Sequence, residues 1–249
     1  MWNIRSASSS VAVTVGTVVI LCSSAGTEAA QAGSTASVKG AVTFEGEVPA
    51  PKMMLITKNN ETCGTGQREI AEVSTTAEGR LRDVVVFVDG KIEGAAPPNP
   101  PESYELLQQG CRFQPYVFYV PKGETLKIVN GDPVAHNIHT YELIGRARRD
   151  LFNFSQPHEG HTKELKIKPR RGNVVQLTCD IHDFMAGWIF VPENPFAVVA
   201  TEGTFLLEGI PPGARTIKVF HPTLGFQEKQ VNLVAGETVD IHFVYPASQ

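Results

Sequence analysis

The chain has little charge, few cysteines and no apolar segment long enough to cross a membrane. Its 22 Lys and Arg against 26 Asp and Glu give a net charge of −4, so it lacks the basic excess that nucleic-acid binding requires. The apolar run at residues 11–21 is short, whereas a membrane-spanning helix needs about 20 residues. A hydrophobic fraction of 42% excludes a disordered chain, and 249 residues suffice for one large or two modest domains.

The first residues have the pattern of an export signal. Arg5 supplies a positive start, the apolar run follows, and residues 30–32 form a small-x-small cleavage site. Residues 1–32 are therefore predicted to be a signal peptide, and the mature protein to be periplasmic or secreted, without a transmembrane span. Cys22 leaves a lipid-attached alternative open, although Leu21 stands where lipid attachment requires a small residue.

A short stretch, residues 179–185, places three kinds of metal ligand close together. It contains the thiol of Cys179, the imidazole of His182 and the thioether of Met185, between two strand patterns. A blue-copper site takes two His nitrogens and one Cys sulfur in a plane, with a weak axial Met. The second His must come from elsewhere in the chain, and His136 is the natural supplier. The stretch predicts a type 1 copper site on a tight turn held by two strands.

The spacing Cys-x-x-His-x-x-Met resembles the ligand loop of the cupredoxins, and most of all the short loop of amicyanin. The similarity covers residues 115–192 and implies one copper ion that moves a single electron. Carried over position by position, it implies four ligands and one residue that helps to hold the Cys loop: His136, Cys179, His182 and Met185, with Asn137. Asp183 stands where the amicyanin-like loop has Pro, a departure that concerns the redox potential and the rigidity of the loop more than metal binding.

The cysteines outside this stretch are predicted to pair. Export means an oxidising compartment, where spare thiols form disulfides. With Cys22 removed in the signal and Cys179 on copper, Cys63 and Cys111 remain for each other. A bridge closing a loop of about 49 residues would stabilise the fold by about 4 kcal/mol, because it restricts the unfolded chain. Two separate thiols are the alternative.

Strand patterns dominate the rest of the chain. Apolar or alternating segments recur between Gly and Pro turns at residues 36–44, 81–88, 115–120, 124–130, 134–139, 162–168, 173–178 and 186–191. Only residues 102–109 have a short helical pattern, ended by Gly110. The pattern predicts an all-β protein built from antiparallel sandwiches, and the resemblance implies that one of them is a cupredoxin-like Greek-key β-sandwich.

Three further histidines lie near the predicted site in sequence. His139 follows His136 by three residues, so in a strand it faces the opposite side and is expected to be a neighbour of the site. Residues 151–161 are expected to form an exposed loop that contains His158 and His161. Their spacing would suit a second metal, but no carboxylate or Cys pattern completes the ligand set.

After residue 192 the character of the chain changes. Residues 192–195 have a linker composition, and strand and turn patterns then alternate to residue 245. Pieces of this region resemble the carboxypeptidase regulatory-like domain, a transthyretin-like β-sandwich: residues 201–207, 210–213 and 234–237. The expected division is a copper-binding domain with an N-terminal extension at residues 33–192 and a smaller β domain at residues 193–249.

The N-terminal strands offer another division of the chain. Residues 38–42 resemble the opening strand of a regulatory-like domain, and residues 193–249 are short for a whole domain of this kind. Strands from residues 36–58 are therefore alternative partners for the C-terminal strands. The copper module would then be an insertion.

The predicted function is one-electron transfer by one type 1 copper ion, with unidentified redox partner proteins, and not catalysis. No general base, nucleophile or phosphate loop accompanies the site, and four ligands leave no position for a substrate. The alternative is a copper-binding or surface adhesion protein in which redox change is incidental. A fragment of a multicopper oxidase or nitrite reductase would need extra His clusters, which the sequence lacks.

Partner docking is expected at an exposed ring edge of His182. Phe184 would contribute to an apolar patch around this edge, and Asp183 would add negative charge that favours a cationic partner. Plain core packing of Phe184 is the other interpretation.

Overall fold

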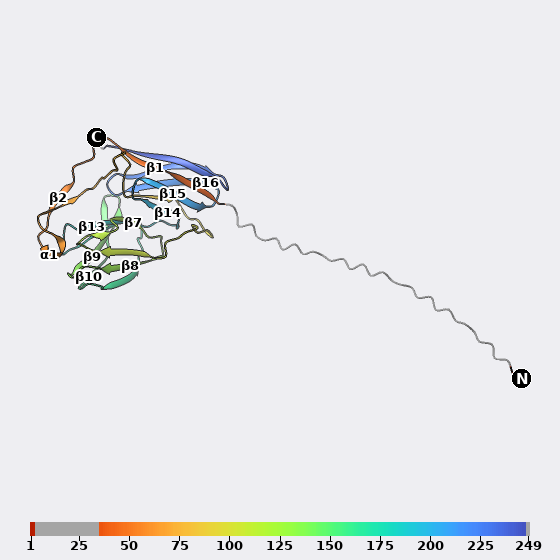
Figure 1. The fold of residues 1–249 in the computed structure, drawn as a ribbon, viewed down its shortest axis with the longest axis horizontal. Coiled ribbons are helices and arrows are strands. Elements are labelled where there is room, and N and C mark those ends of the chain that lie inside the picture. Colours follow the sequence, from red (N-terminus) through yellow and green to blue (C-terminus); the bar gives the residue numbers. More distant parts are fainter. Residues whose placement is uncertain (3–34, 248–249) are drawn as a thin grey trace. The chain divides into compact units, whose positions relative to one another are not determined.

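The protein is almost entirely β-structure. The structure is a computed structural model that describes residues 1–2 and 35–247, and within these ranges it contains 18 strands and one short helix (Figure 1). The described residues from 35 to 247 belong to one compact unit. The expected export signal lies outside the described residues, apart from its first two. In the described part, the helix is too short to span a membrane.

The strands of the predicted copper module form two sheets around one hydrophobic core. The five-stranded sheet has the order β10 (Ala147–Gln156), β9 (His136–Ile144), β12 (Val174–Thr178), β13 (Ala186–Phe190) and β7 (Val117–Tyr119). The four-stranded sheet has the order β11 (Thr162–Lys166), β8 (Thr125–Asn130), β5 (Tyr104–Gln108) and β6 (Phe113–Gln114). Alternate residues of both sheets enter the shared core, among them Leu106, Ile128, Ile138, Leu177 and Ile189.

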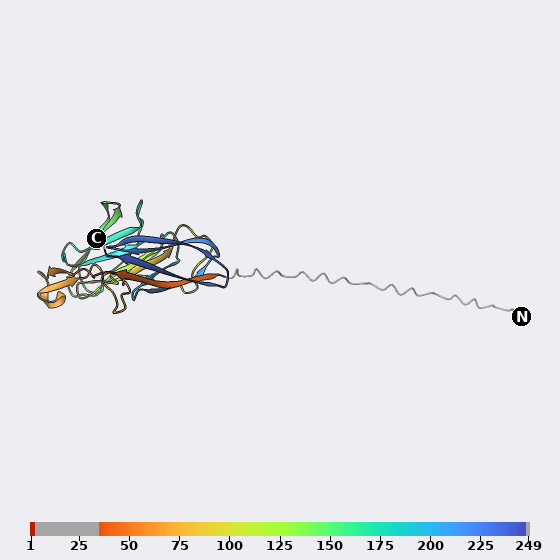
Figure 2. The ribbon, with the colours of Figure 1, turned by 90° about the horizontal axis from the view of Figure 1, so that it is seen from above.

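A second sandwich combines strands from both ends of the chain. Its three-stranded sheet has the order β15 (Thr204–Ile210), β1 (Ala36–Glu45) and β18 (Thr238–Pro246). The four-stranded sheet has the order β14 (Ala197–Ala200), β4 (Val84–Val88), β16 (Gly213–His221) and β17 (Gly225–Leu233). Figure 2 shows the red N-terminal strand β1 running beside blue C-terminal strands, and the core between these sheets includes residues from both, such as Val42, Val86, Phe205, Val219 and Phe243.

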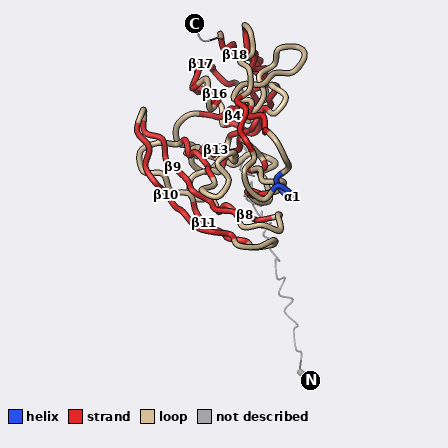
Figure 3. The backbone as a smooth tube through the Cα atoms, turned by 90° about the vertical axis from the view of Figure 1, so that its left-hand side faces the viewer, coloured by secondary structure: helices blue, strands red, loops and turns tan. Residues whose placement is uncertain are grey.

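The two sandwiches pack on each other through a third apolar cluster. It joins β4, β14 and β16 to β7, β12 and β13, with Phe87 and Phe190 in contact at a ring-centroid distance of 4.3 Å. All five residues of β4 are buried, because this strand has core on both faces. Figure 3 shows the resulting arrangement, with β8 to β11 on one side of the molecule and β16 to β18 on the other.

The division expected at residues 192–193 does not coincide with the division between the sheets. β1 pairs in antiparallel fashion with β15 and in parallel with β18, and β4 pairs with β14 and β16. The strands from β5 to β13 therefore lie, in sequence, between two parts of the second sandwich. A small hairpin, β2 (Lys52–Leu55) and β3 (Gln67–Ile70), encloses helix α1 (Asn60–Cys63).

Two local expectations are wrong. Residues 102–109 do not form a helix: β5 occupies this segment, in parallel pairing with β8. Residues 151–161 are not simply a loop, because β10 continues to Gln156 in antiparallel pairing with β9. In both segments the neighbouring strands complete the backbone hydrogen bonds, and this pairing overrides the local pattern. Not every pair is antiparallel, since β7 and β13 also run in parallel.

Candidate metal centre

The strand topology brings three predicted ligands together at one end of the first sandwich. His136 is the first residue of β9, and Cys179 follows β12 directly, in the turn that leads to β13. β9 and β12 are hydrogen-bonded neighbours, so this turn lies over the start of β9. One ligand atom each of His136, Cys179 and His182 lies within 4.8 Å of the others, and all three residues are buried.

Both histidine rings turn Nδ1 towards the centre and use Nε2 as a hydrogen-bond donor. Nε2 of His136 lies 2.8 Å from a carboxylate oxygen of Asp132, and Nε2 of His182 lies 2.9 Å from the amide oxygen of Asn59. These oxygens can only accept, so each ring carries its proton on Nε2. Each Nδ1 is left with a lone pair that is free to bind a metal.

The two Nδ1 atoms and the thiol of Cys179 are close neighbours in the buried centre. The two Nδ1 atoms are 3.2 Å apart, and the sulfur of Cys179 lies 3.8 Å from Nδ1 of His182. Burial lowers the pKa of His182 to about 4, so this ring is neutral at pH 7. Two lone pairs that face each other in a buried site repel unless a cation lies between them.

The donor set and its spacing fit a copper or zinc ion. Ligands at about 2.0–2.3 Å from one ion are separated from each other by about 3.3–3.8 Å in trigonal or tetrahedral geometry. The two measured separations, 3.2 Å and 3.8 Å, are close to this range. One thiolate and two imidazoles are soft or borderline ligands, which exclude Mg²⁺ and Ca²⁺ as the preferred ions.

Met185 lies in the same buried cluster as Cys179. Its side chain is 2% exposed, and its backbone N–H donates to the carbonyl oxygen of His182 at 2.9 Å. This bond closes a tight turn, so Met185 follows His182 at the bottom of the ligand loop. The thioether therefore belongs to the core beneath the loop.

Asn137 connects the Cys loop to β9. Its backbone N–H points to the sulfur of Cys179 at 3.4 Å, and its side-chain oxygen accepts from the backbone N–H of Asp180 at 3.2 Å. The side-chain nitrogen donates to Asn153 on β10 at 2.5 Å. Through these three contacts Asn137 holds the thiol and the residue after it, and ties them to β10.

Asp132 is a residue of the centre that the sequence interpretation missed. Its carboxylate is almost fully buried and accepts three hydrogen bonds, from Nε2 of His136 and from the backbone N–H groups of Gly110 at 2.7 Å and Cys111 at 2.8 Å. A carboxylate behind a metal-binding histidine fixes the orientation of the ring and increases its basicity. In the sequence, an acidic residue four positions before His136 was the signal that could have pointed to this role.

Cys63 and Cys111, the cysteines expected to pair, form a disulfide in the structure. The bridge ties α1 to the turn before β6 and lies beside the candidate ligands: both sulfurs are within 4.8 Å of a ring nitrogen of His182. Asn59, directly before α1, holds the same ring through Nε2. The segment of residues 59–64 therefore covers His182.

The expected apolar docking patch at this loop is wrong. His182 is 0% exposed and Phe184 is 3% exposed, because residues 59–64 cover the first and Arg68 stacks over the ring of the second at 4.8 Å. Phe184 is thus packed in the core, the other interpretation of the sequence. Asp183 is exposed, as expected of a charged loop residue.

The remaining histidines lie outside the centre. His139 faces away from His136 on β9, as expected, and its Nδ1 lies 2.9 Å from a carboxylate oxygen of Asp180. The rings of His158 and His161 are 5.5 Å apart. Within the described residues, no third metal-ligand group accompanies this pair.

No family model and no curated protein matches the chain. Solved structures similar to it include a purple cupredoxin from Nitrosopumilus maritimus, which is 21% identical. The similarity covers 36% of this chain and 99% of the purple cupredoxin, with a TM-score of 0.31. Amicyanin from Paracoccus versutus is 16% identical, covering 43% of this chain and 96% of that chain with a TM-score of 0.31. A Cu-containing nitrite reductase from Thermus scotoductus SA-01 is 21% identical. The similarity covers 41% of this chain and 25% of the reductase chain, with a TM-score of 0.29. Similarity over less than half of the chain does not establish a function. The function is inferred from the residues of the site.

Proposed function

We propose that the protein is an exported type 1 copper protein that carries single electrons. The ligands are His136, Cys179, His182 and Met185, and the observation that carries the assignment is the meeting of two histidine Nδ1 atoms with one thiol in a buried site. When bound there, copper supplies a reversible one-electron oxidation and reduction. Four ligands leave no position for a substrate, so the protein is not an enzyme.

The residues around the ligands keep the site the same in both redox states. Asp132 and Asn59 hold the two imidazoles by Nε2, so each Nδ1 stays directed at the centre. The backbone N–H of Asn137 donates to the thiolate and stabilises its negative charge. A site held from outside in this way needs little rearrangement when an electron arrives or leaves.

The proposed organisation places the copper module inside another β domain. The module corresponds to β5 to β13, and the second sandwich, formed by β1, β4 and the strands after residue 196, is the regulatory-like domain. The pairing of β1 with β18 and of β4 with β16 supports the insertion. The disulfide is in keeping with a periplasmic or secreted location, where redox proteins would be the partners.

A second function, the holding of copper without fast electron exchange, is favoured by one observation. His182 is fully buried, and Asn59 and Cys63 of the disulfide-linked segment of residues 59–64 lie against its ring. A covered ligand ring lengthens the path to any redox partner on that side. A copper-holding protein would bind the ion tightly and cycle slowly.

The visible spectrum of the copper-loaded protein, followed through an oxidation and reduction titration, tests the assignment. An intense thiolate-to-copper band that bleaches and returns supports the electron carrier, and Cys179→Ser should abolish it while the far-UV circular dichroism stays unchanged. The matched control is His158→Ala, an exposed histidine outside the site that should leave the band intact. A colourless complex, or one that does not cycle, would contradict electron transfer.

A further inference from the structure

The disulfide directly adjoins the candidate metal centre. The sulfurs of Cys63 and Cys111 and a ring nitrogen of His182 are all within 4.8 Å of one another. The Cys111 sulfur is also within 4.8 Å of a carboxylate oxygen of Asp132 and a ring nitrogen of His136. Two further sulfur atoms therefore adjoin both histidines of the proposed copper site.

Arg68 holds the two cysteines together independently of the bond between their sulfurs. This guanidinium is 6% exposed and donates to three carbonyl oxygens, those of Cys63 at 2.6 Å, Gly110 at 3.0 Å and Cys111. A buried arginine that bonds both cysteine carbonyls bridges α1 and the turn before β6. Breaking the sulfur–sulfur bond leaves this bridge in place.

Asp132 holds the same turn from the other side. Its carboxylate accepts from the N–H groups of Gly110 and Cys111, while Arg68 takes their carbonyl oxygens. The backbone N–H and carbonyl groups of Gly110 and Cys111 are thus all held by charge-assisted hydrogen bonds. The cysteine on the turn has little freedom to move away after reduction.

We propose that Cys63 and Cys111, once reduced, form a second soft-metal site, which binds Cu(I) and adjoins the first site at His182. A dithiol reductant of the compartment gives two electrons and two protons to the disulfide and becomes a disulfide itself. The Cu(I) ion then displaces the two thiol protons, which go to solvent, and binds between the thiolates. Thiolate sulfur is the ligand type that selects Cu(I), and the two cysteines supply both of the ligands that the ion needs here.

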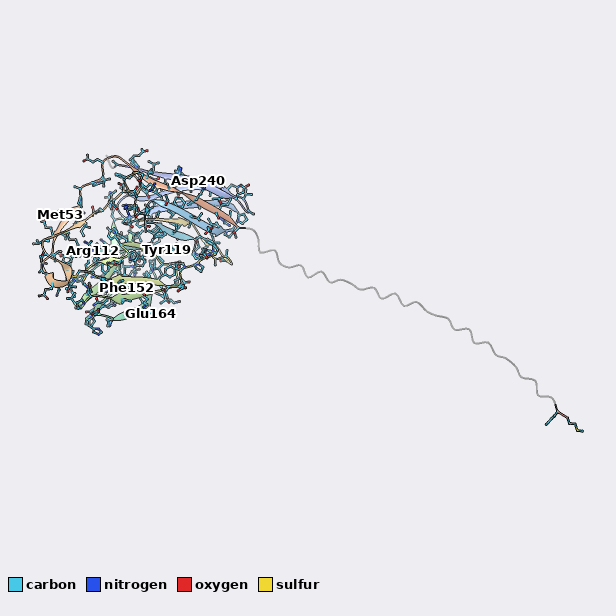
Figure 4. The ribbon with its side chains drawn as sticks, in the orientation of Figure 1. Met53, Arg112, Tyr119, Phe152, Glu164 and Asp240 are labelled. Atoms are coloured by element: carbon cyan, nitrogen blue, oxygen red, sulfur yellow. A yellow bond between two sulfur atoms is a disulfide. The ribbon has the colours of Figure 1, made fainter. Side chains whose placement is uncertain are left out.

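A cavity lies next to the residues that hold the two cysteines. A cavity of about 370 Å³ is lined by Arg68, Arg112, Phe184 and Met185, so it borders both the arginine that holds the cysteines and the proposed axial ligand. Arg112, at this cavity, follows Cys111 directly and lies on the side of the molecule that carries α1 (Figure 4). A site of this kind goes beyond the proposed function, because it needs only the thiols and not a blue-copper centre.

The test uses Cys179→Ser, so that the first site cannot account for the result. The oxidised and the dithiol-reduced forms of this variant are titrated with Cu(I) under anaerobic conditions, against a Cu(I) chelator. We expect the reduced form to bind one Cu(I) per chain more than the oxidised form, with the release of about two protons per ion near neutral pH. Equal binding by the two forms, or unfolding of the chain on reduction, would overturn the proposal.

Two further variants show whether the cysteines and their support are responsible. Adding Cys63→Ser and Cys111→Ser to Cys179→Ser should abolish the extra ion, and an extra ion that persists would place it elsewhere. Arg68→Lys keeps the positive charge but lacks the planar guanidinium whose two nitrogens reach the separate carbonyls, so the affinity for the extra ion should fall by at least about tenfold. An unchanged affinity would refute the holding role. Absence of the thiolate-to-copper band from the oxidised wild-type protein, by contrast, would refute only the proposed function.

Discussion

Glu142 is predicted to stabilise the fold through a negative charge that low pH removes. The side chain is fully buried on β9, where Oε1 accepts from the backbone N–H groups of Arg171 at 2.5 Å and Gly172 at 2.6 Å. Oε2 accepts from the guanidinium of Arg149, with Nε at 3.1 Å. Burial by itself raises the pKa of Glu142, but these hydrogen bonds and the Arg149 charge together outweigh it and lower the pKa to about 2.

The size of the effect follows from the two pKa values. A pKa of about 2 in the folded chain, against the ordinary 4.5, corresponds to about 3 kcal/mol of stability at neutral pH. Since the folded-state pKa is the lower one, the contribution is fully present above the unfolded pKa and is lost as the pH falls from 4.5 towards 2. At about pH 3 the same two pKa values give a contribution of about 1.4 kcal/mol to the free energy of unfolding.

Glu142→Gln keeps the shape of the side chain and removes its charge. Urea unfolding should show a loss of about 3 kcal/mol at about pH 7, narrowing to about 1.4 kcal/mol at about pH 3. The control is Glu164→Gln, an exposed carboxylate on β11 (Figure 4), which should change the unfolding free energy by less than about 0.5 kcal/mol at either pH. A loss below about 1 kcal/mol at neutral pH, or one of equal size at both pH values, would refute the reasoning.

Three other changes test the site and the fold. Asp132→Asn removes the charge behind His136 and should weaken copper binding by about 10–100-fold in a chelator competition; an unchanged affinity would contradict the orienting role. Gly40→Ala places a Cβ 1.7 Å from the carbonyl oxygen of Ile241, between β1 and β18. Urea unfolding should therefore show a destabilisation of about 4 kcal/mol or more. A loss under about 1 kcal/mol would mean that the two strands separate easily. Copper at about 100 times its dissociation constant should raise the unfolding free energy by about 2.7 kcal/mol, and thermal unfolding should show that Cys179→Ser abolishes this increase.

The candidate site could be predicted from sequence where its geometry is local. Cys179, His182 and Met185 are three residues apart, so one tight turn between two strands is enough to gather their side chains. The buried and half-exposed alternation of β9 likewise follows from its sequence, which places His136 inside and His139 outside. The copper assignment itself stays a prediction until the spectrum is measured.

Expectations went wrong where pairing partners decide the outcome. Residues 102–109 have a helical pattern, yet β5 forms there because β8 offers a parallel edge to Leu106 and its neighbours. The domain boundary near residue 192, drawn from a change in composition, stays a prediction. The pairing of β1 with β18 agrees with the alternative division that residues 38–42 offered.

By itself, the sequence determined the all-β class, the ligand turn and the cysteines that are free to pair, because strand periodicity and short spacings are local properties of the chain. Only the tertiary structure decided that Asn59 reaches a histidine 123 residues away, that Arg68 holds both bridged cysteines, and that His182 is covered instead of exposed. Such contacts depend on which strands become neighbours and on where a disulfide closes a loop. These are non-local outcomes of packing, and no pattern within a few residues encodes them.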